Sequence, residues 1–409
     1  MTTLLRFLPI PLADAPEVEA LLVRLGLGPF DPATLSALPG RNDTWAGTTA
    51  SGTAVFVKRL TGPAEDVRRR MDRALAFEAL TATGPERAMR GPRLLGSDEE
   101  GGLLAFEYLE GARNGTELML DQTFGPDLAA QAGKALGLLH ATALPCGTGG
   151  GNGRDGQAVR ALDTSTPPLP SLGLLEALPL PMYEEASSAE LQTWQLLQND
   201  ASLIAAVTAL LEAERTAPKV PAHCDLRMDQ FLVTTGTTAE TGTKTDTTAD
   251  PGRPRLLVAD WEEFRAGDAA RDIGGFVGEW LHRSVLDIVM HRGGSAQQDA
   301  DPLSGAEAFS QAGMSRKTVL HRGRSNLLRV RPVIEAFWAG YRQARPRVDP
   351  GLAHRATGFA GWHLLDRLLA GAARANHLRA IERAAAGIGR TALIAPARFT
   401  TTLGLGETS

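Results

Sequence analysis

A polar loop and a later acid frame two short apolar runs in the second half of the chain. Residues 221–233 read Pro-Ala-His-Cys-Asp-Leu-Arg-Met-Asp-Gln-Phe-Leu-Val, so His223, Asp225 and Gln230 come directly before an apolar run. A second run, residues 256–259, ends at Asp260. Phosphoryl transfer needs a carboxylate that orients the attacking hydroxyl and oxygen ligands that hold Mg²⁺. His223 and Asp225 alone would suit a loop that is merely held in place, but Asp260 in the right order favours chemistry.

Lysine is rare in this chain, and one lysine ends a strand pattern. Only five of the 42 basic residues are lysines, and Lys58 is the only one among the first 130 residues. It follows the apolar, β-branched run at residues 54–57, which is typical of a strand. Because an ammonium and a guanidinium do different chemistry, Lys58 is a candidate site residue in this arginine-rich chain.

The elements that must position these residues divide the chain into a strand-rich front and a helix-rich back. We expect strands at residues 42–49, 54–58, 103–106, 230–233 and 256–259. We expect helices at residues 17–26, 68–80, 128–139, 191–215, 275–291, 327–345 and 352–384. This order predicts an α+β protein of two lobes.

Three ranges describe the predicted organisation: a helical extension at 1–40, a small lobe at 41–110 and a helical lobe at 111–409. A threonine-rich stretch interrupts the last range beside the two acid-bearing motifs. Nine of the sixteen residues at 234–249 are Thr, with almost nothing apolar, so we expect a disordered insert at 234–254.

The motifs together resemble the aminoglycoside phosphotransferase family, a branch of the protein-kinase-like fold. The resemblance rests on His223-x-Asp225-x₄-Gln230-Phe-Leu-Val and then Leu-Val-Ala-Asp260-Trp-Glu. It implies a small β-rich N-lobe, a large helical C-lobe, a catalytic loop at 221–233 and a metal motif at 256–272. It also implies a kinase that uses ATP and Mg²⁺, with Asp225 as the base and Gln230 and Asp260 on the metal. The family has Asn where this chain has Gln230, which offers the same carbonyl oxygen one methylene further out.

The same resemblance assigns nucleotide contacts to the front of the chain. Lys58 would contact the α- and β-phosphates, with Glu78 as its ion-pair partner and Glu65 as the alternative. Asn42 would lie in a hairpin over the phosphates. The backbone of Glu107 and Leu109 would pair with adenine, although an ordinary strand end fits these residues too.

Around the catalytic loop the resemblance implies three further roles. Arg227 would support the transferring phosphate, with a surface cation as the alternative interpretation, and His223 completes the predicted catalytic set. Asp272 is expected to brace the loop.

Composition excludes several classes of protein. The formal charge of −5 argues against a general nucleic-acid binder, which would carry a basic excess. Cys146 and Cys224, the two cysteines, provide neither a disulfide framework nor a cysteine-rich zinc site, which suits a reducing compartment. No run approaches the roughly 20 apolar residues of a membrane span, and the first residues do not read as a signal peptide. We therefore expect a cytoplasmic protein with no nucleic-acid or membrane partner.

Several stretches resemble the kinase-like subunit of class V lanthipeptide synthetases. They are Arg41-Asn-Asp-x-Trp45, Pro221-Ala-His-Cys-Asp-Leu-Arg, Asp260-Trp-Glu-Glu-Phe, Gly274-Gly-Phe-x-Gly-Glu-Trp280 and Ala360-Gly-Trp-His-Leu-Leu-Asp366. This resemblance implies phosphorylation of Ser and Thr in a ribosomally made precursor peptide, with a separate lyase subunit that then eliminates phosphate.

The late part of the chain is basic. Residues 314–347 carry nine Lys or Arg against one acid, Glu335, and are a candidate dock for an acidic leader peptide. A solvated helical face is the alternative. Two other functions stay open: a small-molecule kinase for an aminoglycoside or sugar, which the basic helices disfavour, and a pseudokinase that binds a peptide. The presence of Lys58, Glu78, Asp225 and Asp260 disfavours the pseudokinase, whereas Gln230 keeps it open.

Overall fold

The computed structural model describes residues 9–38, 40–144, 161–234, 254–290, 316–373 and 375–406. The chain divides into two units that are discontinuous in sequence. Unit 1 consists of Met1–Thr123, Leu144–Asp163 and Asp229–Phe264, and unit 2 of Phe124–Ala143, Thr164–Met228 and Arg265–Ser409. The predicted threonine-rich insert lies, except for its first and last residues, outside the described residues.

A five-stranded antiparallel sheet forms the centre of unit 1, in the order β1-β2-β3-β5-β4. Its strands are β1 (Ser36–Leu38), β2 (Asp43–Thr48), β3 (Ala54–Arg59), β4 (Leu94–Asp98) and β5 (Leu103–Glu107). The expected strands at 42–49, 54–58 and 103–106 are confirmed. Along the central strand β3 the buried Val55 and Val57 alternate with partly exposed neighbours, as the two-residue period of a strand requires.

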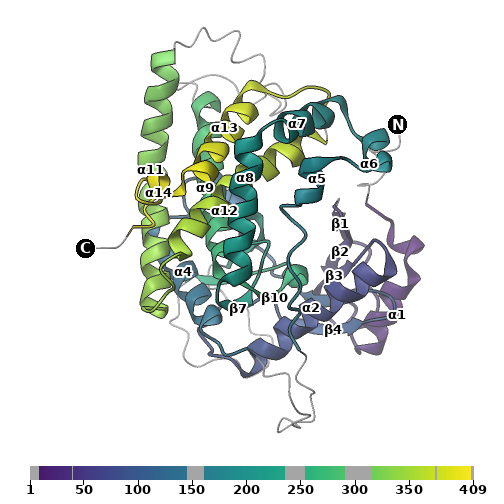
Figure 1. Cartoon of the computed structure of the whole chain (residues 1–409). Coiled ribbons are helices and arrows are strands. Elements are labelled where there is room, and N and C mark those ends of the chain that lie inside the picture. Colours follow the sequence, from purple (N-terminus) through teal and green to yellow (C-terminus); the bar gives the residue numbers. More distant parts are fainter. Residues whose placement is uncertain are drawn as a thin grey trace, which may run out of the picture. The chain divides into compact units, whose positions relative to one another are not determined.

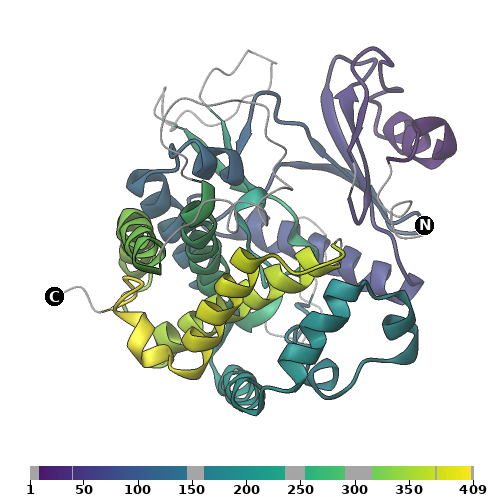
Figure 2. The same ribbon diagram turned by 90° about the horizontal axis from the view of Figure 1, so that it is seen from above.

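The first part of the chain belongs to this sheet. Helix α1 (Pro16–Arg24) matches the helix expected at 17–26, and its buried Val18, Leu21 and Leu22 join a core with Trp45 and Val57. Figure 2 shows α1 beside the sheet. Strand β1 pairs with β2 and was not predicted, since its three residues are too few to show a pattern. The predicted helical extension at 1–40 is therefore partly a strand and shares a core with the small lobe.

Unit 1 also contains helices α2 (Ala64–Thr83) and α3 (Gly115–Leu120) and a second sheet. The second sheet has the order β6-β8-β9, from β6 (Arg113–Asn114), β8 (Phe231–Thr234) and β9 (Arg255–Val258). A short helical turn, η4 (Trp261–Glu263), follows β9 and packs against α2, where the rings of Trp261 and Phe77 stack with centroids 3.6 Å apart. This packing, and the β6–β8 pairing, place 111–123 and 229–264 in unit 1 instead of the predicted helical lobe.

Unit 2 is mainly helical. Its long helices are α4 (Pro126–His140), α7 (Ser188–Gln198), α8 (Ala201–Thr216), α9 (Ala269–Met290), α11 (Arg316–Ala344), α12 (Leu352–Ala372) and α13 (Ala380–Ile394). Helices α4 and α11 lie side by side (Figure 1), and a Cβ at Gly133 would stand 1.9 Å from the carbonyl oxygen of Phe337, so only glycine permits this approach. The helices expected at 191–215 and 352–384 are each two helices. No described helix is both long and apolar enough to span a membrane.

A two-stranded antiparallel sheet also lies in unit 2. Strands β7 (Lys219–Ala222) and β10 (Arg265–Asp268) pair with Ala222 opposite Arg265. Strand β7 includes the first two residues of the predicted catalytic loop at 221–233, and β10 lies within the predicted metal motif at 256–272. The α+β organisation with a small antiparallel sheet and a large helical part is confirmed.

Candidate functional site

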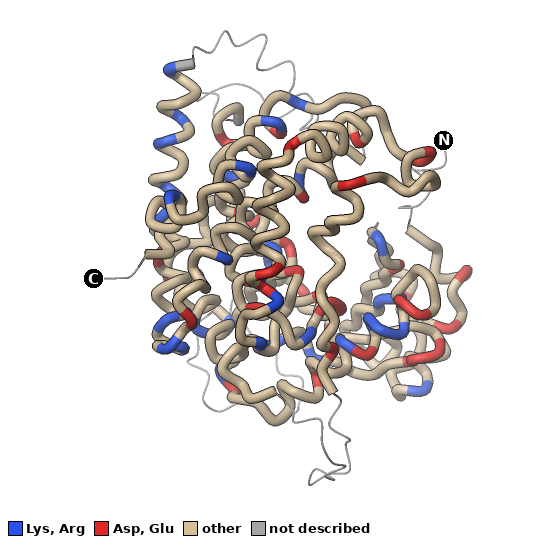
Figure 3. Tube along the Cα trace, in the orientation of Figure 1, with Lys and Arg blue, Asp and Glu red and all other residues tan. Residues whose placement is uncertain are grey.

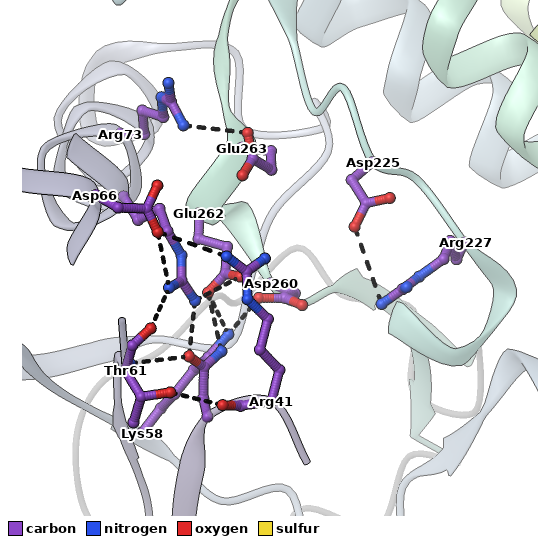
Figure 4. Close-up of polar contacts among 12 residues, drawn as sticks. Arg41, Lys58, Thr61, Asp66, Arg73, Asp225, Arg227, Asp260, Glu262 and Glu263 are labelled. Atoms are coloured by element: carbon purple, nitrogen blue, oxygen red, sulfur yellow. Dashed lines mark hydrogen bonds and ion pairs between the residues drawn. The ribbon is translucent and has the colours of Figure 1, made fainter. Parts of the chain in front are cut away.

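Lys58 lies on the central strand of unit 1 and faces two carboxylates. Its register neighbours are Thr44 on β2 and Leu104 on β5. The ammonium forms ion pairs with Asp260 and with Glu262, the latter at 2.8 Å between Nζ and Oε2 (Figure 4). Burial alone would lower the pKa of Lys58, but the two carboxylates outweigh it and raise this pKa. Lys58 is therefore held in its charged form.

Glu262 is the centre of a buried polar network. Its Oε1 lies 2.9 Å from Nη2 of Arg70, whose side chain is fully buried, and its Oε2 accepts a 3.2 Å hydrogen bond from Nδ2 of Asn42. Asn42 in turn accepts a 2.7 Å hydrogen bond from Arg70 through its Oδ1. A buried carboxylate is stable only when it is paired in this way. The network links α2, η4 and the segment before β2, and through Lys58 it reaches β3.

The predicted ion pair between Lys58 and Glu78 is wrong. The face of α2 that packs on η4 carries Arg70 and Phe77, and Glu262 lies between this face and Lys58. Glu78 is directed elsewhere: burial raises its pKa to about 7, Arg90 opposes this, and Glu107 adds to it. The alternative partner, Glu65, is exposed and pairs with Arg69 at 3.5 Å.

The two predicted metal ligands come together at one end of the β8–β9 pair. Phe231 is opposite Val258, and the backbone N–H of Ala259 donates a 2.9 Å hydrogen bond to the carbonyl of Gln230. Gln230 is buried, and Asp260 follows directly in the left-handed backbone region with φ of 70°. An amide oxygen and a carboxylate are the hard oxygen donors that Mg²⁺ takes, so the donor set fits this ion. Among the described residues there is no cluster of three or more His, Cys, Asp or Glu that could hold a metal by itself.

The other predicted nucleotide contacts have mixed outcomes. The Asn42 side chain belongs to the Glu262 network, which gives it a structural contact in addition to any nucleotide role. The Glu107 N–H donates to the carbonyl of Arg93 at 2.9 Å, and the Leu109 carbonyl accepts from Ala112 at 3.0 Å. Adenine pairing by Glu107 and Leu109 stays a prediction.

In unit 2 a buried side chain holds the predicted catalytic loop in place. Asp225 is half-exposed, with its Oδ2 3.9 Å from Nη2 of Arg227 (Figure 4). His223 is fully buried, and its Nδ1 accepts a 3.3 Å hydrogen bond from the backbone N–H of Asp225. His223 therefore positions the loop, whereas the Asp225 side chain is 45% exposed and that of Arg227 is 27% exposed.

Asp272 braces this loop, as the sequence predicted. Its carboxylate accepts hydrogen bonds from the backbone N–H groups of His223 at 2.8 Å and Cys224 at 2.7 Å. His140 lies 3.0 Å away through Nε2. Burial would raise the pKa of Asp272, but the hydrogen bond and charge of His140, with His223, lower it below its usual value. Cys224 has a φ of 66°, and burial raises the pKa of its thiol.

Sequence reasoning missed Arg70 and Glu262. The buried residues of α2 include Arg70, Ala74, Phe77 and Thr81. These four recur at steps of four, three and four, which is the helical period. An arginine within such a stripe indicates a buried ion pair, and this was the available signal.

Comparison with known proteins bears on the same ranges. The family model described as "Phosphotransferase enzyme family" matches residues 34–242, about half of the chain. No curated protein matches the sequence at a significant level.

Among solved structures, similarity extends over nearly the whole chain at low identity. A protein of Thermobifida fusca YX-ER1 provisionally named a fructosamine-3-kinase is 16% identical, with 92% of this chain and 98% of that chain covered and a TM-score of 0.46. A choline/ethanolamine kinase family protein of Mesorhizobium loti is 15% identical, with 96% and 99% covered and a TM-score of 0.46. The amicoumacin kinase hAmiN, in complex with AMP-PNP, Ca²⁺ and Ami, is 14% identical, with 94% and 95% covered and a TM-score of 0.47. Likenesses of this degree concern the fold alone.

Proposed function

The chain belongs to the phosphotransferase enzyme family, and from this premise we propose that it transfers phosphate from ATP to Ser and Thr hydroxyls of a ribosomally made precursor peptide. A separate lyase would then eliminate the phosphate, so that the two proteins together dehydrate the peptide. The observation that carries the phosphotransfer part is the convergence of Lys58, Glu262 and Asp260 at the end of the β8–β9 pair, beside Gln230.

Each charged group has a role in this proposal. Asp225 orients the acceptor hydroxyl and accepts its proton, and Arg227 offsets charge that develops on the transferring phosphate. Lys58 positions the α- and β-phosphates. Gln230 and Asp260 would hold Mg²⁺, which when bound neutralises charge on the phosphate oxygens.

The peptide acceptor is supported by the resemblance to class V lanthipeptide kinases and by the exposed face of α11. This helix carries seven Lys or Arg and one acid. Figure 3 shows basic residues along its upper part. Residues on the exposed face recur every three or four positions: Lys317, Leu320, His321, Arg324 and Leu328. Leu320 and Leu328 are 63% and 56% exposed. A basic face with exposed leucines suits an acidic peptide that forms an amphipathic helix.

The acceptor test is direct. The protein is incubated with Mg²⁺ and ATP and, separately, with a Ser/Thr-containing precursor peptide, an aminoglycoside, a sugar or choline, and phosphate gain is followed by mass spectrometry. We expect the mass of the precursor peptide to increase by one phosphate for each Ser or Thr that the protein modifies. Transfer to a small molecule with none to any peptide would replace this proposal with a small-molecule kinase.

The docking surface has its own test. Arg322 donates to the carbonyl of Ile288 at 3.0 Å and Arg329 pairs with Asp287, so reversing these charges would disturb the fold. The exposed Lys317 and Arg324 are the better targets. A Lys317→Glu, Arg324→Glu variant should weaken binding of an acidic leader peptide by about tenfold at low salt and less at high salt. Arg383→Glu, an exposed position on α13 of the same unit, is the matched control and should leave binding unchanged.

A further inference from the structure

Two carboxylates share the Lys58 ammonium, and only one of them is a predicted metal ligand. We propose that Glu262 is the residue that positions Lys58. This role was predicted for Glu78 on α2 from the sequence resemblance. The inference rests on the use of ATP in the proposed function and is independent of the peptide acceptor. Asp260 would exchange Lys58 for the metal, whereas Glu262 would keep Lys58 directed at the phosphates.

The surroundings of the two carboxylates differ in the way this division requires. The Asp260 side chain is 26% exposed, whereas that of Glu262 is 9% exposed. Glu262 binds Lys58 through Oε2 and Arg70 through Oε1, so each of its oxygens contacts a different cation. A carboxylate that is held at both oxygens keeps the bound cations in one geometry. A phosphate-binding group such as the Lys58 ammonium needs this kind of preorganisation.

Arg70 fixes Glu262 in turn. Its guanidinium is buried and donates to three acceptors outside α2: the Thr61 carbonyl at 2.9 Å, Asn42 Oδ1 at 2.7 Å and Glu262 Oε1 at 2.9 Å. These acceptors lie after β3, before β2 and on η4. The connection from α2 to Lys58 therefore runs through an arginine on the helix and a glutamate on η4. Among the residues that the structure describes, Lys58 forms no ion pair with Glu78.

A neighbouring ion pair supplies a matched control. Arg73 of α2 and Glu263 of η4 lie 3.1 Å apart through Nη1 and Oε2, so they join the same two elements. Arg73 also binds Asp163 at 2.7 Å, whereas Lys58 pairs with Asp260 and Glu262. Loss of either pair should loosen α2 from η4, but only loss of the Glu262 pair should change Lys58.

The experiment compares Glu262→Gln with Glu263→Gln in the full chain. The dissociation constant for an ATP analogue with Mg²⁺, the rate of ATP hydrolysis and the thermal midpoint are measured for each. We expect Glu262→Gln to weaken analogue binding by about tenfold, the size of one lost charged hydrogen bond, while Glu263→Gln binds as the wild type does. A second comparison, Arg70→Lys against Arg73→Lys, tests the same idea if Glu262→Gln does not fold.

A double-mutant cycle separates positioning from a general loss of stability. In a Lys58→Ala background, Glu262→Gln should cause no further loss of analogue affinity, because its effect acts through Lys58. Equal losses for the Glu262 and Glu263 variants, or full additivity with Lys58→Ala, would overturn the inference while ATP use stands. A wild-type protein that binds no ATP analogue would refute the proposed function, and the inference with it.

Discussion

Glu78 offers a test whose sign distinguishes the structure from the sequence-based pairing. Its pKa is raised to about 7 from an ordinary 4.5, mainly by burial. A raised pKa in the folded state means that folding favours the protonated carboxyl. The stability this contributes is fully present below pH 4.5 and is lost as the pH rises through 7. A Glu78 paired with Lys58 would have a lowered pKa, and its contribution would instead appear above pH 4.5 and be lost in acid.

The size of the effect follows from the shift. A pKa raised from 4.5 to about 7 corresponds to about 3 kcal/mol of unfolding free energy. Partial solvent exposure of the Glu78 side chain reduces this free energy to about 2 kcal/mol. Glu78→Gln removes the titrating group and leaves a side chain of the same size. We therefore expect the variant to gain about 2 kcal/mol of unfolding free energy over the wild type between pH 4.5 and pH 8.

The assay is urea unfolding at several pH values, followed by tryptophan fluorescence and far-ultraviolet circular dichroism. Coincidence of the two transitions justifies a two-state comparison of the variants. Glu65→Gln, at a position on the same helix whose side chain is 71% exposed, controls for removal of a carboxylate from α2. A variant that becomes less stable than the wild type as the pH rises would refute the reasoning and restore the Lys58 pairing.

Three further outcomes are expected. Asp225→Asn should lower turnover by orders of magnitude with ATP binding retained, as steady-state kinetics and analogue titration would show; a modest loss of rate would contradict its role. Lys58→Arg should raise the Michaelis constant for ATP, because a planar guanidinium cannot replace an ammonium held between two carboxylates. Asp272→Asn should lower the unfolding free energy by about 3 kcal/mol, because the Asp272 carboxylate accepts hydrogen bonds from two backbone N–H groups of the predicted catalytic loop. A variant with the same thermal midpoint as the wild type would contradict this expectation.

The strands and the order of the motifs could be predicted from the sequence. Val55 and Val57 alternate with partly exposed residues, Gln230 directly precedes an apolar run, and Asp260 directly follows another. These signals are local: each depends on a few neighbouring residues and on the two-residue period of a strand. The bracing role of Asp272 was also predictable, but only because the family motif places it.

The partner of Lys58 could not be predicted in the same way. It depends on which face of α2 packs on η4, and the two segments are separated by more than 170 residues. A rotation of α2 by one residue would exchange Arg70 for Met71 on that face. The stacking of Phe77 on Trp261 selects the rotation, and this contact has no signature in the local sequence. Strand β1 was missed for a related reason, since its pairing with β2 is a tertiary contact.

Cys224 and Gly267 restrict each other in size. Cys224 takes a left-handed backbone conformation, which favours glycine, and its sulfur would lie 2.6 Å from a Cβ added at Gly267. The space between Gly267 and the predicted catalytic loop is therefore filled by the Cys224 side chain. A glycine at 224 would relax the backbone and vacate that space, and an alanine at 267 could then occupy part of it after a small shift of Ala222. Sequence variation at these two positions is consequently expected to be linked, with one of them always small.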